Sequence, residues 1–307
     1  MGVILLVGLV LRFWTGDDLM LSRYAGYLMP WLLVGLLPGA LWAGLMHHRG
    51  LSFLLGGSAI IIFVAYAPLF MSRPEVSDQD TPQFKVLSYN IWSKNLDISR
   101  AAGNIHKLRP DIVLLQEVTP KAFHKLEGYL ADLYSGQEVH FFFEPSLLLM
   151  VVSRYPADFN LRIVGKGRVQ KIGLRSPVGL ITVFNVHLLR RGGWQSRYNK
   201  IFSLLQEEVA HEAGAVILGG DFNTPDQSQT YKVIKKFLDN AHWEAGFGFG
   251  FSFPTSAKKL FGLFSAPALI RIDHIFFNNH FVALRAATIK DSGGSDHFPV
   301  MAVLSLK

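Results

Sequence analysis

Carboxylate, amide and imidazole side chains stand repeatedly at the ends of short apolar runs between residues 84 and 307. Strand ends, and the loops beyond them, are where a scaffold presents functional groups. Carboxylate and amide oxygens suit a hard cation such as Mg²⁺, and imidazoles transfer protons or donate hydrogen bonds. The side chains in question are Asn90, Glu117, His187, Asp221, Asn223, Asp273, Asp296 and His297.

Each of these residues has an ordinary structural explanation when it is taken alone. Asp221–Asn223 is also typical of a turn, Glu117 of a helix start, and His187 of a hydrogen-bonded core histidine. Their joint occurrence at successive strand ends is much harder to explain in that way. We therefore treat the set as one candidate site. His274 follows Asp273 directly and alternates to the opposite face of its strand, so we leave it outside the site.

The order of these segments resembles the endonuclease/exonuclease/phosphatase superfamily. Abasic-site endonucleases, DNase I, inositol polyphosphate 5-phosphatases and magnesium-dependent sphingomyelinases share this fold. The resemblance covers about residues 84–307 and implies an α+β domain, a four-layer α/β/β/α sandwich of the DNase I type. The matching segments, in chain order, are Leu-Ser-Tyr-Asn90, Leu-Leu-Gln-Glu117, Ser153-Arg-Tyr-Pro156, Asn185-Val-His187-Leu, Gly-Gly-Asp221-Phe-Asn223, Ile-Asp273-His-Ile-Phe and Ser-Asp296-His297-Phe-Pro-Val.

The resemblance implies a metal-dependent hydrolase of phosphoester bonds. Cleavage of a phosphodiester requires neutralised charge on the phosphorus that is attacked and an oriented nucleophile. Mg²⁺ keeps several waters and needs only one or two carboxylates. We expect Glu117 to bind Mg²⁺ with help from Asn90, Asp296 to act on the metal side, and Mn²⁺ to be the alternative ion.

The same resemblance implies roles in the reaction for the other residues. Asp221 would orient the attacking water or assist the leaving group, and Asn223 would contact the phosphate. His187 would donate a hydrogen bond to a non-bridging oxygen. Asp273 would orient His297, in the carboxylate–histidine arrangement of general base catalysis. Whether His297 is the base or a phosphate contact stays open at this stage.

The substrate is less well defined by the sequence. His187, in Asn-Val-His-Leu, resembles the sphingomyelinase and 5-phosphatase branches, whereas abasic-site endonucleases typically have tyrosine there. Residues 247–264 hold six phenylalanines with Lys258 and Lys259 between them. This segment could enter a bilayer interface, stack on bases or pack under the sheet, and we favour packing for residues 247–253. We expect hydrolysis of a lipid or other envelope phosphodiester; the alternatives are a tethered endo/exonuclease and a silent binding domain.

Helices and strands without strict alternation must position these residues. Continuous apolar runs indicate strands buried on both faces, and long β-rich stretches favour a mixed sheet in a two-layer sandwich. We expect strands at 84–90, 112–115, 139–143, 147–153, 161–164, 180–187, 215–218, 272–277 and 299–304, and helices at 97–108, 120–133, 195–212 and 228–238.

Charge is distributed very unevenly along the 307 residues. Charged residues make up 17% of the chain, against about 25% in typical soluble domains, and residues 1–72 hold only five of them. Gly26–Met46 and Leu51–Met71 contain none and are long enough to cross a bilayer. We therefore predict a transmembrane anchor of two or three spans at 1–72, a linker at 73–83 and a catalytic domain at 84–307.

The positive-inside rule gives an orientation for this anchor. Arg49 and two histidines in the 47–50 turn place that turn in the cytoplasm, which puts the catalytic domain on the extracytoplasmic face of a bacterial inner or plasma membrane. A net charge of +7 suits phosphate-bearing partners or an anionic membrane surface, although a merely basic soluble domain explains it equally well. With no cysteine, disulfide and thiolate chemistry are excluded. Nothing in the sequence indicates an obligate protein partner.

Overall fold

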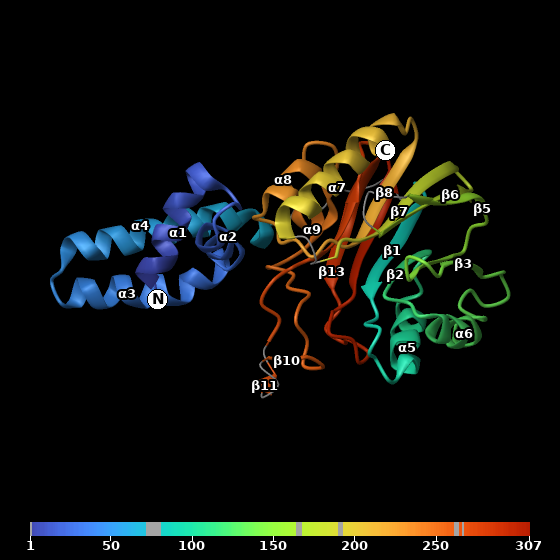
Figure 1. The fold of residues 1–307 in the computed structure, drawn as a ribbon, viewed down its shortest axis with the longest axis horizontal. Coiled ribbons are helices and arrows are strands. Elements are labelled where there is room, and N and C mark those ends of the chain that lie inside the picture. Colours follow the sequence, from blue (N-terminus) through green and yellow to red (C-terminus); the bar gives the residue numbers. More distant parts are fainter. Residues whose placement is uncertain (1, 72–80, 164–167, 190–192, 261–263, 266) are drawn as a thin grey trace.

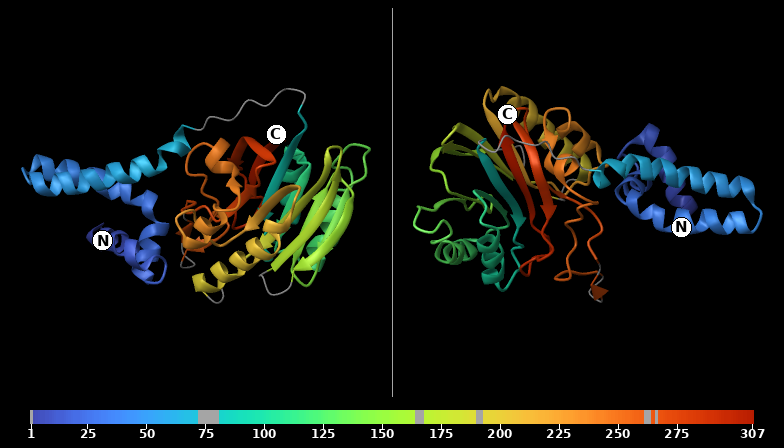
Figure 2. Two further views of the ribbon diagram at one scale, coloured as in Figure 1. Left: turned by 90° about the horizontal axis from the view of Figure 1, so that it is seen from above. Right: turned by 180° about the vertical axis from the view of Figure 1, so that it is seen from behind.

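The computed structural model describes residues 2–71, 81–163, 168–189, 193–260, 264–265 and 267–307. A helical region, residues 2–71, projects from one end of a larger β-rich domain that begins at Gln83 (Figure 1). Figure 2 shows the same arrangement in two further directions. Most of the linker predicted at 73–83 lies outside the described residues.

Two six-stranded mixed sheets form the centre of the β-rich domain. The first has the order β13-β14-β1-β2-β4-β3, and the second has the order β5-β6-β7-β8-β12-β9. The strands are β1 Gln83–Asn90, β2 Ile112–Gln116, β3 His140–Glu144, β4 Leu149–Ser153, β5 Ala157–Ile163, β6 Arg168–Ser176, β7 Gly179–His187, β8 Ala215–Asp221, β9 Asp239–Asn240, β12 Asp273–Phe277, β13 Phe281–Thr288 and β14 Val300–Leu306. Lys259–Leu260 (β10) and Phe264–Ser265 (β11) pair separately.

Three apolar clusters show that the domain has four layers. The cluster between the sheets includes Val86, Leu114, Val183 and Ile217. Helices α5 (Ile98–Leu108) and α6 (Pro120–Tyr129) cover the outer face of the first sheet, and α7 (Gly193–Glu207) and α8 (Gln229–Ile234) cover that of the second. The predicted α+β sandwich with DNase I-like layering is therefore present. Because β2 and β8 are buried on both faces, they begin with continuous apolar runs, Ile112–Leu115 and Ala215–Leu218.

The sequence prediction missed the long strands β6 and β13 and the two-residue strands β9, β10 and β11. Strand β6 carries Arg168, Gln170, Lys171 and Arg175, so its composition does not favour a strand, yet it pairs with both β5 and β7. Strand β13 contains a register shift between Ala283 and Arg285, which breaks the alternation that would reveal it. The short helix α9 (Ala241–Ala245), capped by Asn240, was also not predicted.

The helical region contains α1 (Gly2–Thr15), α2 (Met20–Tyr27), α3 (Met29–Leu45), α4 (Arg49–Tyr66) and a 3₁₀ turn, η1 (Ala67–Phe70). Gly26–Met46, predicted as one span, is not one straight helix, because α2 and α3 meet at a bend of 79°. Proline has no backbone N–H and its ring clashes with the preceding turn, so Pro30 is accommodated at the start of α3 and not inside a longer helix.

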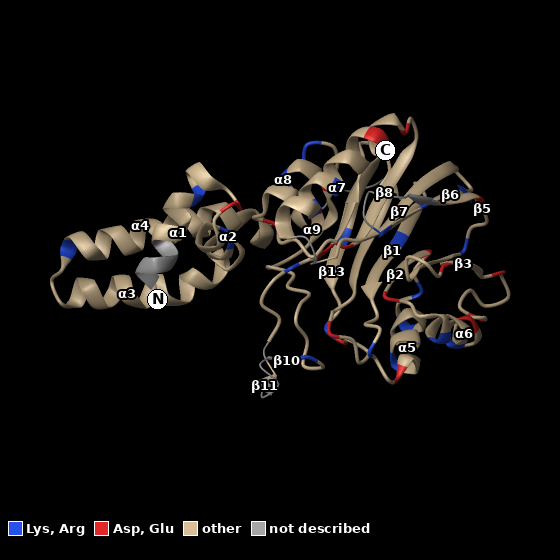
Figure 3. Ribbon diagram, viewed as in Figure 1, with Lys and Arg blue, Asp and Glu red and all other residues tan. Residues whose placement is uncertain are grey.

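In the part of the chain that the structure describes, one helix, from Arg49 to Phe70, is long and apolar enough to cross a membrane, and the bent pair α2–α3 would be a second if it counts as one span. This finding rests on length and composition alone. Apolar side chains on α3 and α4 are widely exposed, as Leu41 (71%), Phe53 (79%) and Ile61 (72%) illustrate. Charged residues are absent from both ribbons except at the tip that joins them (Figure 3).

The helical region and the β-rich domain are in direct contact. Trp31 of α3 stacks on Phe251 with ring centroids 5.5 Å apart, and Tyr66 of α4 lies 6.3 Å from Trp243 in the same manner. Asp17 is fully buried, pairs with Arg12 at 2.7 Å and accepts the backbone N–H of Gln229 at 2.7 Å. Phe249, Phe251 and Phe253 thus do pack, as predicted, whereas Phe247 is 72% exposed, and the partner of Phe249 and Phe251 is the helical region and not the underside of a sheet.

Candidate active site

Strand register places three of the candidate residues side by side. Strand β7 runs parallel to β8 with His187 opposite Asp221, and β12 runs antiparallel to β8 with Asp273 opposite Asp221. The site thus begins as a row across three neighbouring strands. Gly220 precedes Asp221 at φ 149°, and a Cβ there would lie 1.9 Å from the carbonyl oxygen of Val186. Glycine is therefore required for β8 to approach β7 at this point.

The first sheet contributes Asn90 and Glu117 to the same place. Asn90 ends β1, which pairs in parallel with β2, and Glu117 directly follows β2. The amide nitrogen of Asn90 lies 3.3 Å from Glu117 Oε1 and 3.0 Å from Asp221 Oδ2. Asn90 therefore joins the two sheets at the centre of the site. A second buried bridge, from Gln116 Nε2 to Asn185 Oδ1 at 2.8 Å, joins the sheets one residue before Glu117 and two residues before His187.

Glu117 is held as a carboxylate that solvent can reach. Its side chain is 23% exposed, and its Oε2 accepts the backbone N–H and the hydroxyl of Ser93 at 2.9 and 2.8 Å. Burial works to raise the pKa of Glu117, but the two Ser93 hydrogen bonds and the nearby His187 outweigh it and lower the pKa. Glu117 also adopts φ 60°, a costly left-handed conformation for a glutamate.

His187 and Asn223 flank Asp221. His187 Nε2 lies 3.7 Å from Asp221 Oδ2 and 3.9 Å from Glu117 Oε1, and burial lowers the pKa of this imidazole despite both carboxylates. His187 Nδ1 is buried and has no hydrogen-bond partner among the described residues. Asn223 donates its backbone N–H to Asp221 Oδ1 at 2.8 Å and its amide to Asp221 Oδ2 at 3.1 Å. Burial nevertheless raises the pKa of Asp221.

His297 and Asp273 form a buried pair. His297 Nδ1 lies 2.9 and 3.1 Å from the two carboxylate oxygens of Asp273, while its Nε2 lies 3.8 Å from Asp221 Oδ2. Burial alone would lower the pKa of His297, but the charges of Asp273 and Asp221 and the hydrogen bond to Asp273 raise it to about 9. The imidazole is therefore held as a cation at neutral pH, which favours a phosphate contact over a general base.

Asp296, next to His297, faces a different partner. Its Oδ2 pairs with the ammonium of Lys258 at 2.9 Å, and the side chain is 4% exposed. Asp296 Oδ1 is buried without a hydrogen-bond partner in the described part of the chain and lies 3.8 Å from His297 Nε2. Lys258 is 40% exposed and sits 4.7 Å from the ring centroid of Phe253. A metal cation bound beside Asp296 would thus be repelled by the ammonium group of Lys258.

The donor set fits a hard divalent cation. Glu117 supplies a charged, solvent-accessible carboxylate. The amide oxygen of Asn90 already accepts the backbone N–H of Trp92 at 3.0 Å, and Asp296 already pairs with Lys258, so these two residues are weaker ligand candidates than Glu117. Ligand atoms of Asp221, Asp273 and His297 also lie within 4.8 Å of one another. Both oxygens of Asp273 already contact His297 Nδ1, however, so that trio functions better as a hydrogen-bonded pair beside a carboxylate. Glu117 is the better anchor for a metal ion.

His274 lies outside the site, on the opposite face of β12. Its Nε2 contacts the carbonyl oxygen of Thr224 at 2.9 Å, its Nδ1 lies 3.8 Å from Asp226, and its ring packs on Phe222 and Tyr231. Burial lowers the pKa of His274 from its ordinary value of 6.5 to about 4. This histidine is therefore a neutral core residue, as the alternation of the strand implies.

The buried neutral state of His274 makes the fold sensitive to acid. Below pH 6.5 the unfolded chain binds a proton at this position and the folded chain does not, so stability falls as the pH falls from 6.5 toward 4. We expect wild type to lose about 2 kcal/mol more than His274→Gln between pH 7 and pH 5. Urea unfolding of the full chain at both pH values measures this difference. The exposed His280→Gln variant should behave like wild type, and an equal loss in His274→Gln would contradict the assignment.

Three contributors to the site were not identified from the sequence: Ser93, Ser252 and Lys258. Ser93 follows Asn90 by three residues, and its position after a strand end was the available signal. Ser252 accepts the backbone N–H groups of Ile272 and Asp273 at 3.1 and 3.3 Å. No local pattern marks it, because its partners lie about twenty residues away and its segment has no regular structure.

Comparisons with known proteins identify a family and several proteins of similar structure. Residues 87–297 match the profile of the Endonuclease/Exonuclease/phosphatase family. A protein of Vibrio campbellii named UPF0294 protein is 24% identical in an alignment of 249 residues that covers 76% of this chain and 81% of that protein. A family protein from Bacteroides thetaiotaomicron superposes with a TM-score of 0.60 at 17% identity, covering 74% of this chain and 99% of that one. Mannosyl-6-phosphatase Bt3783 of the same species superposes with a TM-score of 0.56 at 18% sequence identity, covering 72% of this chain and 99% of that one.

Proposed function

The chain belongs to the Endonuclease/Exonuclease/phosphatase family, whose members are phosphoesterases and nucleases, and from this premise we propose that it is a divalent-metal-dependent phosphodiesterase. The observation that carries the proposal is the convergence of polar residues from separate strand ends on Asp221. Within 4 Å of its carboxylate lie the side chains of Asn90, His187, Asn223 and His297. The substrate we favour is a lipid or another envelope phosphodiester.

The residues divide the work of hydrolysis between them. A cation bound at Glu117 and Asn90 would neutralise charge on the phosphate. Asp221 has a raised pKa and therefore suits the orientation of the attacking water and acceptance of its proton. The His297 cation, held by Asp273, donates to a non-bridging phosphate oxygen, where negative charge develops. His187 and Asn223 add neutral donors on either side of Asp221.

We also propose that the helical region embeds in a membrane. The exposed side chains of α3 and α4 are apolar on several faces, whereas the core helix of a soluble protein would have most of these side chains covered. Helices of 17 and 18 residues span about 26 Å, close to a hydrocarbon core of about 30 Å. Trp31 near the start of α3 and Tyr66 at the end of α4 contact the β-rich domain, and the hairpin of α3 and α4 projects away from it (Figure 1). The proposed bilayer would therefore surround α3 and α4, with the β-rich domain at its surface.

Membrane embedding and orientation are tested together. We expect the chain to stay in the membrane pellet after alkaline carbonate extraction, since the exposed apolar side chains of α3 and α4 cannot be solvated without cost. An alkaline phosphatase fused after Lys307 should be active, because Arg49 at the hairpin tip favours the cytoplasmic side. Release by carbonate would contradict embedding. A fusion that is active only as a cytoplasmic reporter would reverse the orientation.

A substrate panel tests the chemistry. The full chain in detergent with Mg²⁺ is assayed on bis-p-nitrophenyl phosphate, p-nitrophenyl phosphate, sphingomyelin, phosphatidylglycerol, plasmid DNA and RNA. We expect turnover of the model diester and of at least one lipid, abolished by chelation and restored by Mg²⁺ or Mn²⁺. Faster hydrolysis of the monoester would overturn the preference for diesters. Nicking of DNA without lipid turnover would replace the lipid substrate by nucleic acid.

A further inference from the structure

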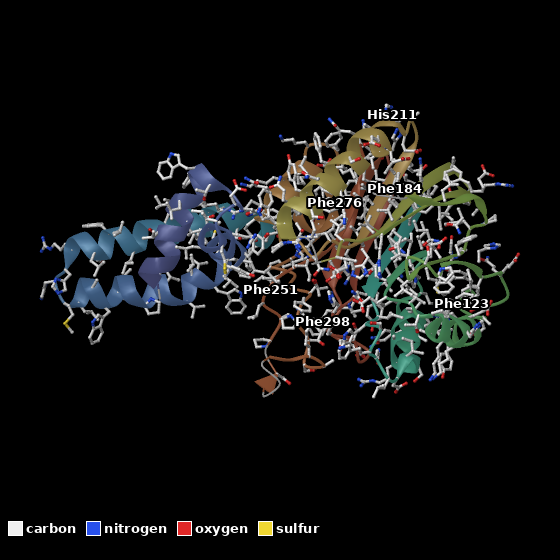
Figure 4. All side chains as sticks on the ribbon, viewed as in Figure 1. Phe123, Phe184, His211, Phe251, Phe276 and Phe298 are labelled. Carbon is white, nitrogen blue, oxygen red and sulfur yellow. The ribbon has the colours of Figure 1, made fainter. Side chains whose placement is uncertain are left out.

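Residues 247–253 connect the helical region to the buried pair of His297 and Asp273, which we call the catalytic pair. We call this stretch the aromatic segment. On one side, the ring centroid of Phe249 lies 5.4 Å from that of Tyr66 and 5.2 Å from that of Phe251. Gly248 donates its backbone N–H to the carbonyl oxygen of Leu69 at 2.7 Å. Figure 4 shows Phe251 where the helices meet the β-rich domain. Helix α4 and the η1 turn therefore contact the first half of the aromatic segment.

Trp31 of α3 contacts the next part of the same segment. Its ring stacks on Phe251 at 5.5 Å with an interplanar angle of 22°, and its indole N–H donates to the carbonyl of Leu269 at 2.7 Å. Residues 253 and 269–270 are themselves paired, since Leu269 and Ile270 donate to the carbonyl of Phe253 at 2.8 and 3.1 Å. Trp31 therefore contacts both of the paired segments, through Phe251 and through Leu269.

The far end of the aromatic segment contacts both members of the catalytic pair. Ser252 Oγ accepts the backbone N–H of Asp273 at 3.3 Å, and the Ser252 carbonyl accepts the N–H of Phe298, which directly follows His297, at 2.8 Å. The ring of Phe253 lies 4.8 Å from the imidazole of His297 at 49°. Ser252 is fully buried and Phe253 is 7% exposed, so neither contact can shift without displacing a packed neighbour.

The junction leaves little room for alternative packing. A cavity of about 10 Å³, lined by Tyr66, Phe249, Phe251 and Arg271, is at most large enough for one water molecule. The surroundings of Phe251, on which Trp31 stacks, therefore have little spare volume. The polar contacts of Arg12 with Asp17 and of Asp17 with Gln229 lie on the same side of the domain and hold α1 in place.

We propose that Trp31 is a positioning residue for the His297–Asp273 pair, acting through Phe251, Ser252 and Phe253. The helical region is then part of the catalytic unit and not only its anchor. The distance from Trp31 to the reacting atoms is bridged by packed rings and backbone hydrogen bonds, and small misplacements of a catalytic group reduce rate steeply. The expected change in kcat rests on the proposed hydrolytic function, whereas the expected change in hydrogen exchange does not.

The test uses the full chain in one detergent with three variants. Trp31→Ala removes the stack and the hydrogen bond, Trp31→Phe keeps an aromatic ring against Phe251, and Trp42→Ala removes a 64% exposed tryptophan from the same helix. For Trp31→Ala we expect kcat on bis-p-nitrophenyl phosphate to fall about tenfold with KM within twofold. Trp31→Phe should recover most of kcat, and Trp42→Ala should match wild type.

Hydrogen exchange provides the readout that does not depend on turnover. In Trp31→Ala, the amides of Asp273 and Phe298, which bond to Ser252, should lose about tenfold in protection, whereas amides in α5 should not change. Wild-type kcat and wild-type exchange in Trp31→Ala would overturn the proposal. So would losses that Trp42→Ala reproduces, or a kcat loss that Trp31→Phe fails to restore. If the wild type hydrolyses nothing, the proposed function fails, and exchange alone decides the role of Trp31.

Discussion

Glu117→Gln is expected to lower kcat/KM in Mg²⁺ by about 10³-fold, because it removes the one negative charge at the solvent-accessible end of the site. Glutamine keeps the size of the side chain and can still accept a hydrogen bond from Ser93, so the loop should stay in place. The charge of Glu117 is what attracts a cation, since hydrogen bonds from Ser93 keep its pKa low. The defect should therefore lie in metal binding.

Two measurements separate metal binding from folding. Calorimetric titration with Mn²⁺ should show affinity reduced at least about tenfold in Glu117→Gln, while the thermal midpoint of the metal-free chain stays near that of wild type. Glu138→Gln is the matched control, because the Glu138 side chain is 81% exposed and far along the chain from the site. Unchanged Mn²⁺ affinity with full activity in Glu117→Gln would remove this residue from the metal site.

The second large effect is expected at Asp273. Asp273→Asn keeps a side chain of the same shape beside His297 but removes the charge that holds the imidazole protonated, so kcat should fall about 10²- to 10⁴-fold. Since the pKa of His297 is raised to about 9, the cation persists until the pH rises through that value. The alkaline limb of the wild-type rate profile should lie there, and Asp273→Asn should move it to lower pH.

A double-mutant cycle tests whether the two residues act as one unit. His297→Gln alone should cost about as much as His297→Gln combined with Asp273→Asn, because Asp273 acts only through the imidazole. Asp239→Asn is the control, as this aspartate is 52% exposed and pairs with Lys235 on the surface. Additive losses in the double variant would mean that Asp273 has a separate function.

The candidate site could be predicted from the sequence because its residues are placed by register. Asn90, His187 and Asp221 each end an apolar strand, and strands buried on both faces can be recognised from one continuous apolar run. Parallel neighbours bring their carboxyl ends to one edge, as His187 opposite Asp221 shows. The chemistry of each side chain and its place at a strand end were thus local information.

Contacts made by irregular segments could not be predicted in that way. Ser252 reaches Asp273, and Trp31 reaches Leu269, across a long stretch of chain, and neither contact leaves a periodic pattern. The bend before Met29 had a local signal in Pro30, but the apolar run that continues through it concealed the break. Strand β6 was missed because charged residues occupy the positions that would otherwise reveal it.

The position of β14 in the first sheet has a consequence for biosynthesis. This last strand lies between β1 and β13, pairing with both, although β1 is the first strand of the domain to leave the ribosome. His297 emerges only three residues before β14 begins. The helical region, with Trp31, is made and available for insertion long before that. A nascent chain that has released only the helical region and β1 therefore has neither a closed first sheet nor the His297–Asp273 pair, and both can form only after β14 has left the ribosome.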